Sequence, residues 1–488
     1  MLPHLKGSDP VYSQLWGESG ELWSGDSRLP DFSYAGYHCG EEAIPDVPVV
    51  GNVSDFGAKG DGVHDDTRAF IDAIEACHDG AIFIPEGRYK ITGILKIGKS
   101  NLVLRGAGKE RTTLYFPKPL NAIEPNWGST TGGRRTSNYS WSGGFIQVKG
   151  DYEATLITKI DAAAKRGDRS VQVASVDGLS EGMRIQIQLE ATDQSLVKYL
   201  YADDFGDISK SRTKEVFQVV RIIRIVADEV FFDRPLRFDL RMDWHPEVRQ
   251  YAPTVSEVGI EDVGFEFPVQ PYEGHFTELG FNPIGLKGVS DCWVRRIHVQ
   301  NCDSGFFISA NFCTLSEIQF ETGRAPDERG RTGHHGYYLQ GSDNLITEFE
   351  INQRFIHDVS VGHNSVGNVI SKGKGIDLTL DHHKHTPYEN LFTDIDTGAG
   401  ERVWLSGGGG ALGKHCAARG TFWNIRAVQS IPYPPEVFGP KTMNLVAVQT
   451  EEESETDLNG KWFEVIDSDL IQPVDLHEAQ LARRLKGD

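Results

Sequence analysis

The feature that most constrains the fold is a short strand pattern that recurs through the second half of the chain. Between residues 294 and 427, six segments share a central apolar residue within a run typical of a β-strand. The segments are VRRIHVQ, LSEIQFE, ITEFEIN, GNVISKG, ENLFTDI and TFWNIRA. Aligned on their central residues, from Ile297 to Trp423, they lie 21, 31, 20, 23 and 31 residues apart. A period slightly above twenty residues, with occasional longer spacings, predicts a solenoid whose loops vary in length.

A second strand pattern follows the first within each repeat: GFFIS, GYYLQ, HDVSV, IDLTL and RVWLS. No helical periodicity lies between the two strands, which argues against leucine-rich and ankyrin repeats. The alternative is a large antiparallel sandwich, although the strands of a sandwich need not keep such a period. The pattern therefore favours an all-β chain folded as a parallel β-helix.

Composition and periodicity divide the chain into five regions. Residues 1–49 lack periodicity and are expected to form a strap over a larger body. Residues 50–165 are expected to begin the β-helix, with a capping helix near TRAFIDAIEAC and a long polar loop. Residues 166–245 are expected to form a small inserted β unit, and residues 246–470 the main turns. Residues 471–488 are expected to form a C-terminal helix.

The charge balance limits the classes of partner. The formal net charge is −21, with 70 acidic and 49 basic residues, which argues against binding to nucleic acid. An acidic polysaccharide remains compatible, because a local basic groove can lie on an acidic body.

The sequence contains no run of about 18 apolar residues, which a membrane-spanning helix would need. The first residues lack the apolar centre of a secretory signal, so the protein is either secreted or periplasmic with its signal removed, or cytoplasmic. Six widely spaced cysteines without a C-x-x-C pair predict mainly buried thiols, with an occasional disulfide.

The stretch VSDFGAKGDGVHDDTRAFIDAI, followed by AIFIPEGRYKI, gives a more specific indication of the fold. It resembles the N-terminal signature of the pectate lyase superfamily, whose members are right-handed parallel β-helices. The resemblance covers residues 50–115 and implies a carbohydrate-active protein, but members of the superfamily hydrolyse, eliminate, epimerise or only bind. The segment lacks the spacing of a phosphate-binding loop or an EF-hand, so we expect its glycines and aspartates to form turns at the start of the coil.

The polygalacturonase pattern of the superfamily is incomplete in this chain. GHHG is present at residues 333–336, but no adjacent Asp-Asp pair precedes it by one turn and no R-I-K follows it. Polygalacturonase chemistry is therefore not expected.

Stacking of the second strands predicts where an active site would lie. If these strands are aligned on their last apolar residue, His335 and His357 fall on neighbouring turns, about 4.8 Å apart. The same alignment places Asp358, Asp377 and Arg402 on consecutive turns. One carboxylate would then raise the pKa of the other, giving an acid and a base, and Arg402 would neutralise a substrate carboxylate.

Histidines are concentrated in the same region, with seven of the sixteen between residues 334 and 385. The run DHHKH at residues 381–385 adds imidazoles and an ammonium group at the end of a strand. Solvated loop residues and buried structural aspartates are the alternative interpretation. The expected catalytic residues are His357, Asp358, Asp377, Asp381, His382, His383 and Arg402. The expected substrate-binding residues are Arg134, Arg135, Trp141, His334, His335, Lys384 and His385.

Three functions are compatible with these residues. The first is a polysaccharide lyase that cleaves a uronic-acid polymer by β-elimination, with a histidine base and with Arg402 or Lys384 as the neutralising group. The second is a glycoside hydrolase in which Asp358 pairs with Asp377 or Asp381. The third is a glycan-binding or tailspike-like protein without activity. No cofactor is indicated with certainty, and a divalent cation such as calcium is an option.

Overall fold

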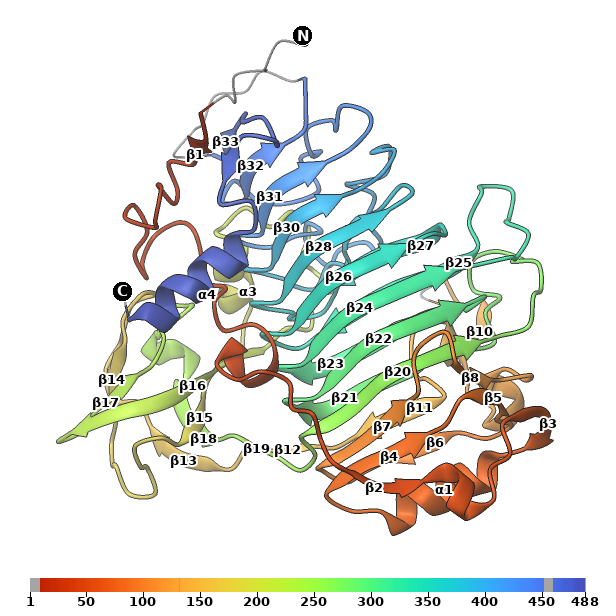
Figure 1. The fold of residues 1–488 in the computed structure, drawn as a ribbon. Helices are drawn as coiled ribbons and strands as arrows, with labels where there is room; N and C mark the ends of the chain where they lie inside the picture. The colour runs from red at the N-terminus through yellow and green to blue at the C-terminus, as the bar shows by residue number, and fades with distance from the viewer. Residues whose placement is uncertain (1–8, 131, 452–459, 488) are drawn as a thin grey trace, which may run out of the picture.

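Two long parallel sheets wind into a coil around a shared apolar core (Figure 1). The computed structural model describes residues 9–130, 132–451 and 460–487. Successive strands along each sheet come from successive turns of the chain, as a solenoid requires. The expected right-handed parallel β-helix is confirmed.

The first sheet has the strand order β2–β4–β7–β20–β22–β24–β26–β28–β30–β31–β32–β33, with β3, β5 and β8 pairing beside it. Its strands are β2 (Val49–Asn52), β3 (Asp61–Asp65), β4 (Gly80–Ile84), β5 (Gly87–Lys90), β7 (Leu102–Gly106), β8 (Thr112–Tyr115), β20 (Val258–Glu266), β22 (Trp293–Gln300), β24 (Thr314–Glu321), β26 (Leu345–Ile351), β28 (Val369–Gly375), β30 (Leu391–Asp396), β31 (Thr421–Arg426), β32 (Asn444–Val448) and β33 (Trp462–Glu464).

The second sheet has the order β29–β27–β25–β23–β21–β11–β6. Its strands are β6 (Leu95–Ile97), β11 (Ile146–Lys149), β21 (Ile284–Ser290), β23 (Phe306–Asn311), β25 (Gly333–Gln340), β27 (Phe355–Val361) and β29 (Leu380–His382). The segment RVWLS, expected as a further strand of this sheet, is a turn instead.

The observed register corrects part of the alignment expected from the sequence. Ile297 lies opposite Ile318, and Ile318 opposite Phe349, as expected. The next turn differs, because Val369 pairs with Leu345 and not with Phe349. Gly373 takes the place of the expected apolar residue, and a Cβ atom there would lie 2.0 Å from the Phe349 ring. The bulky ring of one turn therefore fills the space that the glycine of the next turn leaves.

The glycine- and aspartate-rich segment forms turns at the first turns of the coil. The buried Asp66 carboxylate accepts hydrogen bonds from the backbone N–H groups of Lys59 (2.8 Å) and Gly60 (3.2 Å). Gly60 has a φ of 63°, and a Cβ atom there would lie 2.8 Å from the Tyr89 ring. Helix α1 (Thr67–Ala76) follows and lies across this end of the coil (Figure 1). The segment thus has the structural role expected from its sequence.

A separate antiparallel sheet lies beside the coil, where the sequence predicts an inserted unit over residues 166–245 (Figure 1). Its order is β13–β18–β15–β16–β17–β14. The strands are β13 (Leu156–Lys159), β14 (Ser170–Gln172), β15 (Arg184–Glu190), β16 (Glu215–Val226), β17 (Glu229–Phe232) and β18 (Glu247–Gln250). The apolar core of the unit also contains Val366 and Tyr388 of the coil, so the two parts share buried surface.

Shorter elements complete the structure. Two-stranded pairs are formed by β1 (Val11–Tyr12) with β34 (Ile471–Gln472), β9 (Trp127–Ser129) with β10 (Arg135–Ser137), and β12 (Tyr152–Glu153) with β19 (Ala252–Pro253). The remaining helices are α2 (Leu120–Ile123), α3 (Ser195–Leu200), α4 (Leu476–Lys486) and the 3-10 helices η1 (Tyr37–Gly40), η2 (Val53–Phe56), η3 (Asn138–Ser140) and η4 (Met242–Trp244).

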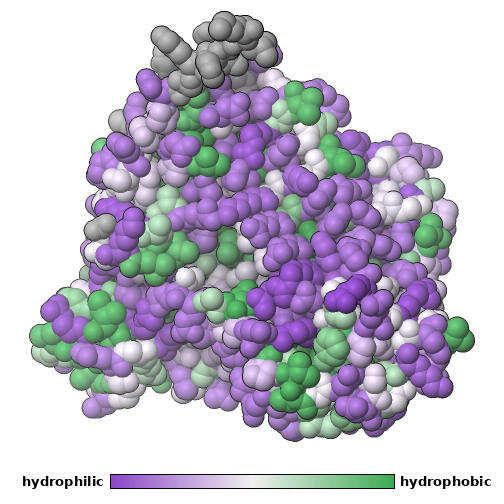
Figure 2. Space-filling model, viewed as in Figure 1, coloured by the Kyte–Doolittle hydropathy of each residue, from purple (hydrophilic) through white to green (hydrophobic). Residues whose placement is uncertain are grey.

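The face shown in Figure 2 is largely hydrophilic, with small scattered apolar areas. Within the described ranges, no helix combines the length and apolar character needed to cross a membrane. The six cysteines are buried and free.

Candidate functional site

A cleft of about 850 Å³ opens over β25 and β27 of the second sheet. Its walls come from these strands, from the polar loop before β11, from the segment between β20 and β21, and from a glycine run after β29. Ten of its side chains are aromatic or cationic: Trp141, His275, Phe276, Arg329, Arg331, His334, His335, Tyr338, His357 and His383. Of the described residues that line the cleft, none is Asp or Glu.

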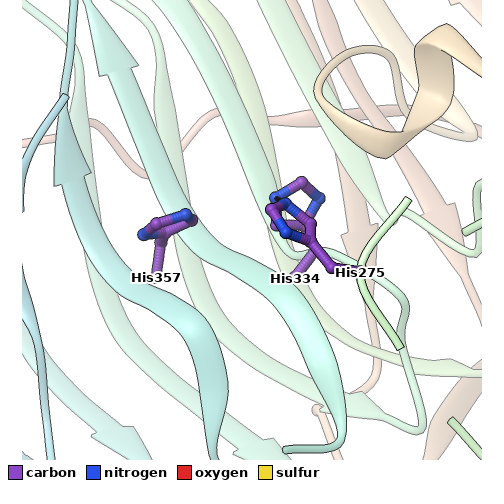
Figure 3. Close-up of side chains that lie close together, drawn as sticks. All are labelled: His275, His334 and His357. Carbon is purple, nitrogen blue, oxygen red and sulfur yellow. Dashed lines mark hydrogen bonds between the residues drawn. The ribbon is translucent and has the colours of Figure 1, made fainter. Parts of the chain in front are cut away.

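Strand pairing brings the central histidines together. His335 lies opposite His357 in the register of β25 and β27, as the stacking argument predicted, and their ring centroids are 5.0 Å apart. His334 precedes His335, and its Nε2 lies 3.0 Å from Nε2 of His275. His275 comes from the loop between β20 and β21, so the histidine cluster combines strand residues with a loop residue (Figure 3).

Asp381 lies behind the histidines and orients two of them. Its Oδ2 is 2.9 Å from Nδ1 of His383, with which it forms a hydrogen bond, and 3.3 Å from Nδ1 of His357. Ser360 Oγ donates to the same oxygen (2.7 Å), and the backbone N–H of Gly407 donates to Oδ1 (2.7 Å). Burial alone would raise the pKa of Asp381, but the two imidazoles and the Ser360 hydroxyl hold it far below its ordinary value. A buried carboxylate therefore stays ionised next to two imidazoles.

Burial keeps most of the cleft histidines neutral. It lowers the pKa of His275 to about 4 and that of His357 to about 3. The pKa values of His334 and His335 also fall well below the ordinary value, first through burial and then through the neighbouring imidazoles. Neutral imidazoles offer a lone pair to a proton or to a metal ion.

A buried acid lies beneath this group. Glu278 Oε1 is 3.7 Å from Nδ1 of His334 and accepts a hydrogen bond of 2.5 Å from the Tyr272 hydroxyl. Burial raises the pKa of Glu278 to about 7. The cleft thus has two carboxyl groups, Asp381 and Glu278, behind its imidazoles.

Asp358, Asp377 and Arg402 lie together, but they form a buried network away from the cleft lining. Arg402 donates to Asp358 Oδ2 (2.7 Å) and to Asp377 Oδ2 (3.1 Å). Asp358 also accepts from the backbone N–H groups of Phe355 and Thr379. Burial, opposed by Arg402, raises the pKa of Asp358, and repulsion from Asp377 is not among the main causes.

The expected alignment of β29 was wrong by two residues. Leu380 pairs with Val359 and not with Val361, so Thr379 lies at the level of Asp358. Strand β29 is short and starts at Leu380, so Asp377 lies outside the regular ladder.

The remaining expected site residues are divided between the cleft and other surroundings. Trp141 lines the cleft, and the Arg134 guanidinium reaches the backbone carbonyl of His275 at 3.5 Å. Arg135 lies over the Trp127 ring instead, 4.5 Å from its centroid.

His382, Lys384 and His385 lie outside the residues that line the cleft. His382 is fully buried among Phe392, Phe422 and Phe438. Lys384 lines a different pocket, and the His385 ring lies 5.2 Å from that of His363.

Sequence reasoning missed several residues of the cleft. His275, Arg329 and Arg331 lie in loops outside the repeating strands, and no period places a loop residue. Tyr338 could have been found, because it alternates with the core residues Tyr337 and Leu339 in the second-strand pattern.

Two groups of side chains in the described part of the chain could hold a metal ion. They are His275, His334 and His357, and His357, Asp381 and His383. Five of these six positions offer an imidazole nitrogen, whereas calcium prefers six to eight oxygen ligands. The donors therefore match a transition metal better than calcium.

Comparisons with known proteins identify the N-terminal part of the coil. Residues 50–124 match the family model described as "Rhamnogalacturonase A/epimerase, pectate lyase-like", which confirms the resemblance to the pectate lyase superfamily. Over 101 residues the chain is 37% identical to mannuronan C5-epimerase AlgE1 of Azotobacter vinelandii, covering 19% of this chain and 7% of that protein. It is 43% identical over 72 residues to alginate lyase 7 of the same organism, covering 13% of this chain and 8% of that protein. The chain thus spans less than a tenth of the length of these curated relatives.

A solved structure resembles a larger part of the chain. The tailspike gp61 of Pseudomonas phage phi297 superposes with a TM-score of 0.49 at 12% identity, covering 82% of this chain and 67% of that chain. A likeness this weak does not indicate a reaction.

Proposed function

We propose that this protein is a polysaccharide lyase that cleaves a uronic-acid-containing polysaccharide by β-elimination. The observation that carries the proposal is the cleft itself, which is lined by imidazoles, a phenol and guanidinium groups, with carboxylates behind them. The names of the N-terminal relatives, mannuronan C5-epimerase and alginate lyase, support a carbohydrate substrate.

Elimination on a uronic acid needs three groups. A base removes the C5 proton, which is adjacent to the carboxylate, a positive group stabilises the charge that develops, and an acid protonates the leaving O4. The C5–H bond breaks, a C4–C5 double bond forms, and the C4–O bond breaks with its electron pair on the leaving sugar. The product is unsaturated, and no water or oxidant is consumed.

His383 is the base in this proposal. Its side chain is about one quarter exposed (25%), so it can reach a substrate, and Asp381 binds Nδ1 and leaves Nε2 available. Tyr338 lies close by, with ring centroids 5.7 Å apart. Burial raises the pKa of Tyr338 to about 12, so its hydroxyl remains protonated and can donate to O4 at neutral pH. Arg329 supplies positive charge at the rim of the cleft, where Arg331 also lies but is paired with Asp327 at 2.6 Å.

The hydrolase alternative has less support. A glycosidase needs two carboxyl groups that face the scissile bond. Asp358, Asp377 and Asp381 are at most 1% exposed, and each already accepts several hydrogen bonds. Arg402 is likewise bound to two of these carboxylates, so Arg329 at the rim replaces it as the positive group in this proposal.

The test is an assay on a panel of acidic polysaccharides that records both ultraviolet absorbance of the unsaturated product and new reducing ends. We expect both signals from at least one polymer, and a loss of about 100-fold or more in His383→Ala. His64→Ala, which removes an exposed histidine far from the cleft in sequence, is the matched control and should keep full activity. Reducing ends without absorbance would show hydrolysis, and binding without either signal would show a glycan-binding protein. Either result would overturn the lyase proposal.

A further inference from the structure

We propose that His275, His334 and His357 form a binding site for one divalent transition-metal ion of the zinc type, open to the cleft (Figure 3). One imidazole nitrogen of each residue lies within 4.8 Å of those of the other two. His275 Nε2 and His334 Nε2 are 3.0 Å apart. Two nitrogens bound tetrahedrally to zinc at about 2.0–2.1 Å would be separated by roughly 3.3 Å, so this pair is already close to the required spacing.

The hydrogen-bonding state of His334 provides an independent observation. His334 is 2% exposed, and its Nδ1 has no hydrogen-bond partner. If His334 Nε2 donates to His275, Nδ1 is a buried acceptor without a donor. If His275 donates instead, Nδ1 carries a buried proton without an acceptor. Either tautomer leaves a buried polar atom unsatisfied, which is unfavourable.

A metal ion would select one of these two tautomers. With Nε2 bound to the ion, the proton of His334 would lie on Nδ1, and Glu278 Oε1, which is 3.7 Å away, would have to move closer to accept it. Oε2 of Glu278 is also buried without a hydrogen-bond partner, so one oxygen of this carboxyl group can still accept a hydrogen bond. A carboxylate that accepts from the second nitrogen of a metal-binding histidine is a common arrangement, because it fixes the tautomer and orients the ring.

His357 has the same arrangement on the other side of the site. Its Nδ1 lies 3.3 Å from Asp381 Oδ2, which leaves Nε2 for the ion. Two of the three proposed ligands therefore have a buried carboxyl group behind them. The third, His275, is only partly buried and belongs to a loop.

The donor set selects the class of ion. Three neutral imidazoles suit zinc and similar borderline metals, whereas magnesium and calcium prefer oxygen ligands. Three protein ligands leave a further coordination position, which here faces the cleft. Binding of the substrate carboxylate at this position rests on the proposed lyase function. The metal site itself rests on the geometry alone.

Metal content and binding are measured on the full chain without a histidine tag, in the absence of polysaccharide. After removal of bound metal with a chelator, titration with zinc chloride is followed by calorimetry, and titration with cobalt chloride by visible absorbance. We expect one ion per chain. His275→Ala should weaken zinc binding at least tenfold, and Glu278→Gln by about 10- to 100-fold. His64→Ala should bind as the unchanged protein does.

Two results would overturn the proposal. One is the absence of stoichiometric binding by the chelator-treated protein. The other is full binding by His275→Ala together with loss in His383→Ala, which would place the ion at His357, Asp381 and His383. Since the readout is binding, a protein that binds zinc at His275 but shows no lyase product would retain this site while losing the proposed function.

Discussion

At the scale of single residues, Asp381 contacts two of the imidazoles that line the cleft. Its carboxylate contacts both His383 and His357 and is fixed by Ser360 and Gly407. It is fully buried and does not line the cleft, so it acts by positioning the imidazoles and keeping their second nitrogens available.

Asp381→Asn should lower kcat without a comparable change in KM. The amide keeps the shape of the side chain but loses the charge that stabilises a protonated His383 after it takes the C5 proton. We expect kcat to fall on the order of 100-fold, measured as the initial rate of unsaturated product over a range of substrate concentrations. Asp55→Asn, at an exposed aspartate, is the control. An unchanged kcat in Asp381→Asn would show that His383 does not depend on this carboxylate.

The sequence could predict part of this arrangement, for a physical reason. His335 and His357 lie on neighbouring strands of one ladder, and ladder positions follow from periodicity. His275 could not be placed, because the segment between β20 and β21 has no periodic pattern and its position depends on tertiary contacts. Asp358 and Asp377 were expected to face a substrate, but Arg402 binds both in the interior. Periodicity alone does not distinguish an aspartate that faces a substrate from one that is bound by an arginine in the interior.

At the scale of elements, a ladder of asparagines connects successive turns. Asn368 is fully buried, and its Oδ1 accepts from both the backbone N–H (3.0 Å) and the Nδ2 (2.9 Å) of Asn344. Its own Nδ2 donates to Gly341 O and to Asn390 Oδ1, both at 3.0 Å. Each amide thus satisfies polar groups of the turns on either side.

Asn368→Ala should therefore destabilise the coil. The change leaves two donors of Asn344 without an acceptor, and each unsatisfied buried group is unfavourable by about 1–3 kcal/mol. We expect the free energy of unfolding to fall by about 2 kcal/mol or more, measured by denaturant titration. Asn352→Ala, at an exposed asparagine one turn away, should change it by less than about 0.5 kcal/mol. Equal stability of the two variants would contradict a structural role for the ladder.

Helix α4 is capped at its N-terminus by Asp475, an aspartate with an unusual pKa. Asp475 accepts from the backbone N–H groups of His477 (2.9 Å) and Glu478 (3.3 Å), yet it is only 5% exposed. Burial, followed by the charge of Glu478, raises its pKa from 3.8 to about 7. The folded state therefore holds this proton more tightly than the unfolded state. The associated stability is complete below pH 3.8 and is lost as the pH rises through about 7.

Asp475→Asn should remove this pH dependence while keeping the helix cap, since asparagine is also a good N-cap residue. We expect the Tm of the variant, relative to that of the unchanged protein, to rise between pH 5 and pH 8. Thermal unfolding at several pH values measures the difference, and an Asp55→Asn variant corrects for the removal of one charge. A constant difference across this range would show that Asp475 titrates near its ordinary pKa.

The elements themselves were more predictable from the sequence than their register. The glycine-rich signature and the period near twenty residues both indicate strands wound into a coil. The signature specifies local turns, and the period specifies a repeated pattern of buried residues. Register failed where the apolar pattern is interrupted, as at Gly373, where the Phe349 ring of the neighbouring turn fills the core. It failed again where a strand is very short, as at β29.

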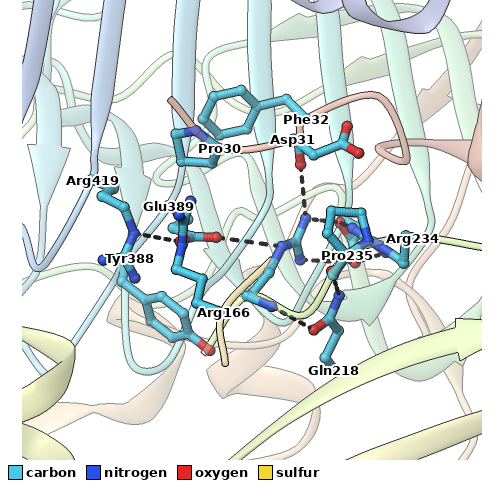
Figure 4. Close-up of polar contacts among 12 residues, drawn as sticks. Pro30, Asp31, Phe32, Arg166, Gln218, Arg234, Pro235, Tyr388, Glu389 and Arg419 are labelled. Carbon is cyan, nitrogen blue, oxygen red and sulfur yellow. Dashed lines mark hydrogen bonds and ion pairs between the residues drawn. The ribbon is translucent and has the colours of Figure 1, made fainter. Parts of the chain in front are cut away.

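At the scale of the whole molecule, buried ion pairs join the inserted sheet to the coil (Figure 4). Glu389 of the coil lies next to three guanidinium groups: Arg419 Nε donates to Oε1 at 2.6 Å, Arg166 Nε donates to Oε1 at 3.2 Å, and Arg237 Nε lies 3.6 Å from Oε2. Asp343 of the coil pairs with Arg237 and with Arg234 in the same way. Arg166, Arg234 and Arg237 come from the inserted region, so these pairs cross the boundary between the two parts.

Glu389→Gln should weaken the attachment of the inserted sheet more than it changes the coil. Removing one partner of a buried ion pair is unfavourable by about 3–5 kcal/mol, because the remaining charges are left uncompensated. We expect a lower Tm and faster hydrogen exchange over residues 156–250, measured by mass spectrometry, with smaller changes in strands β20 to β26. Glu181→Gln, at an exposed glutamate of the inserted unit, should match the unchanged protein. Uniformly faster exchange along the entire coil would show instead that the two parts unfold as one cooperative unit.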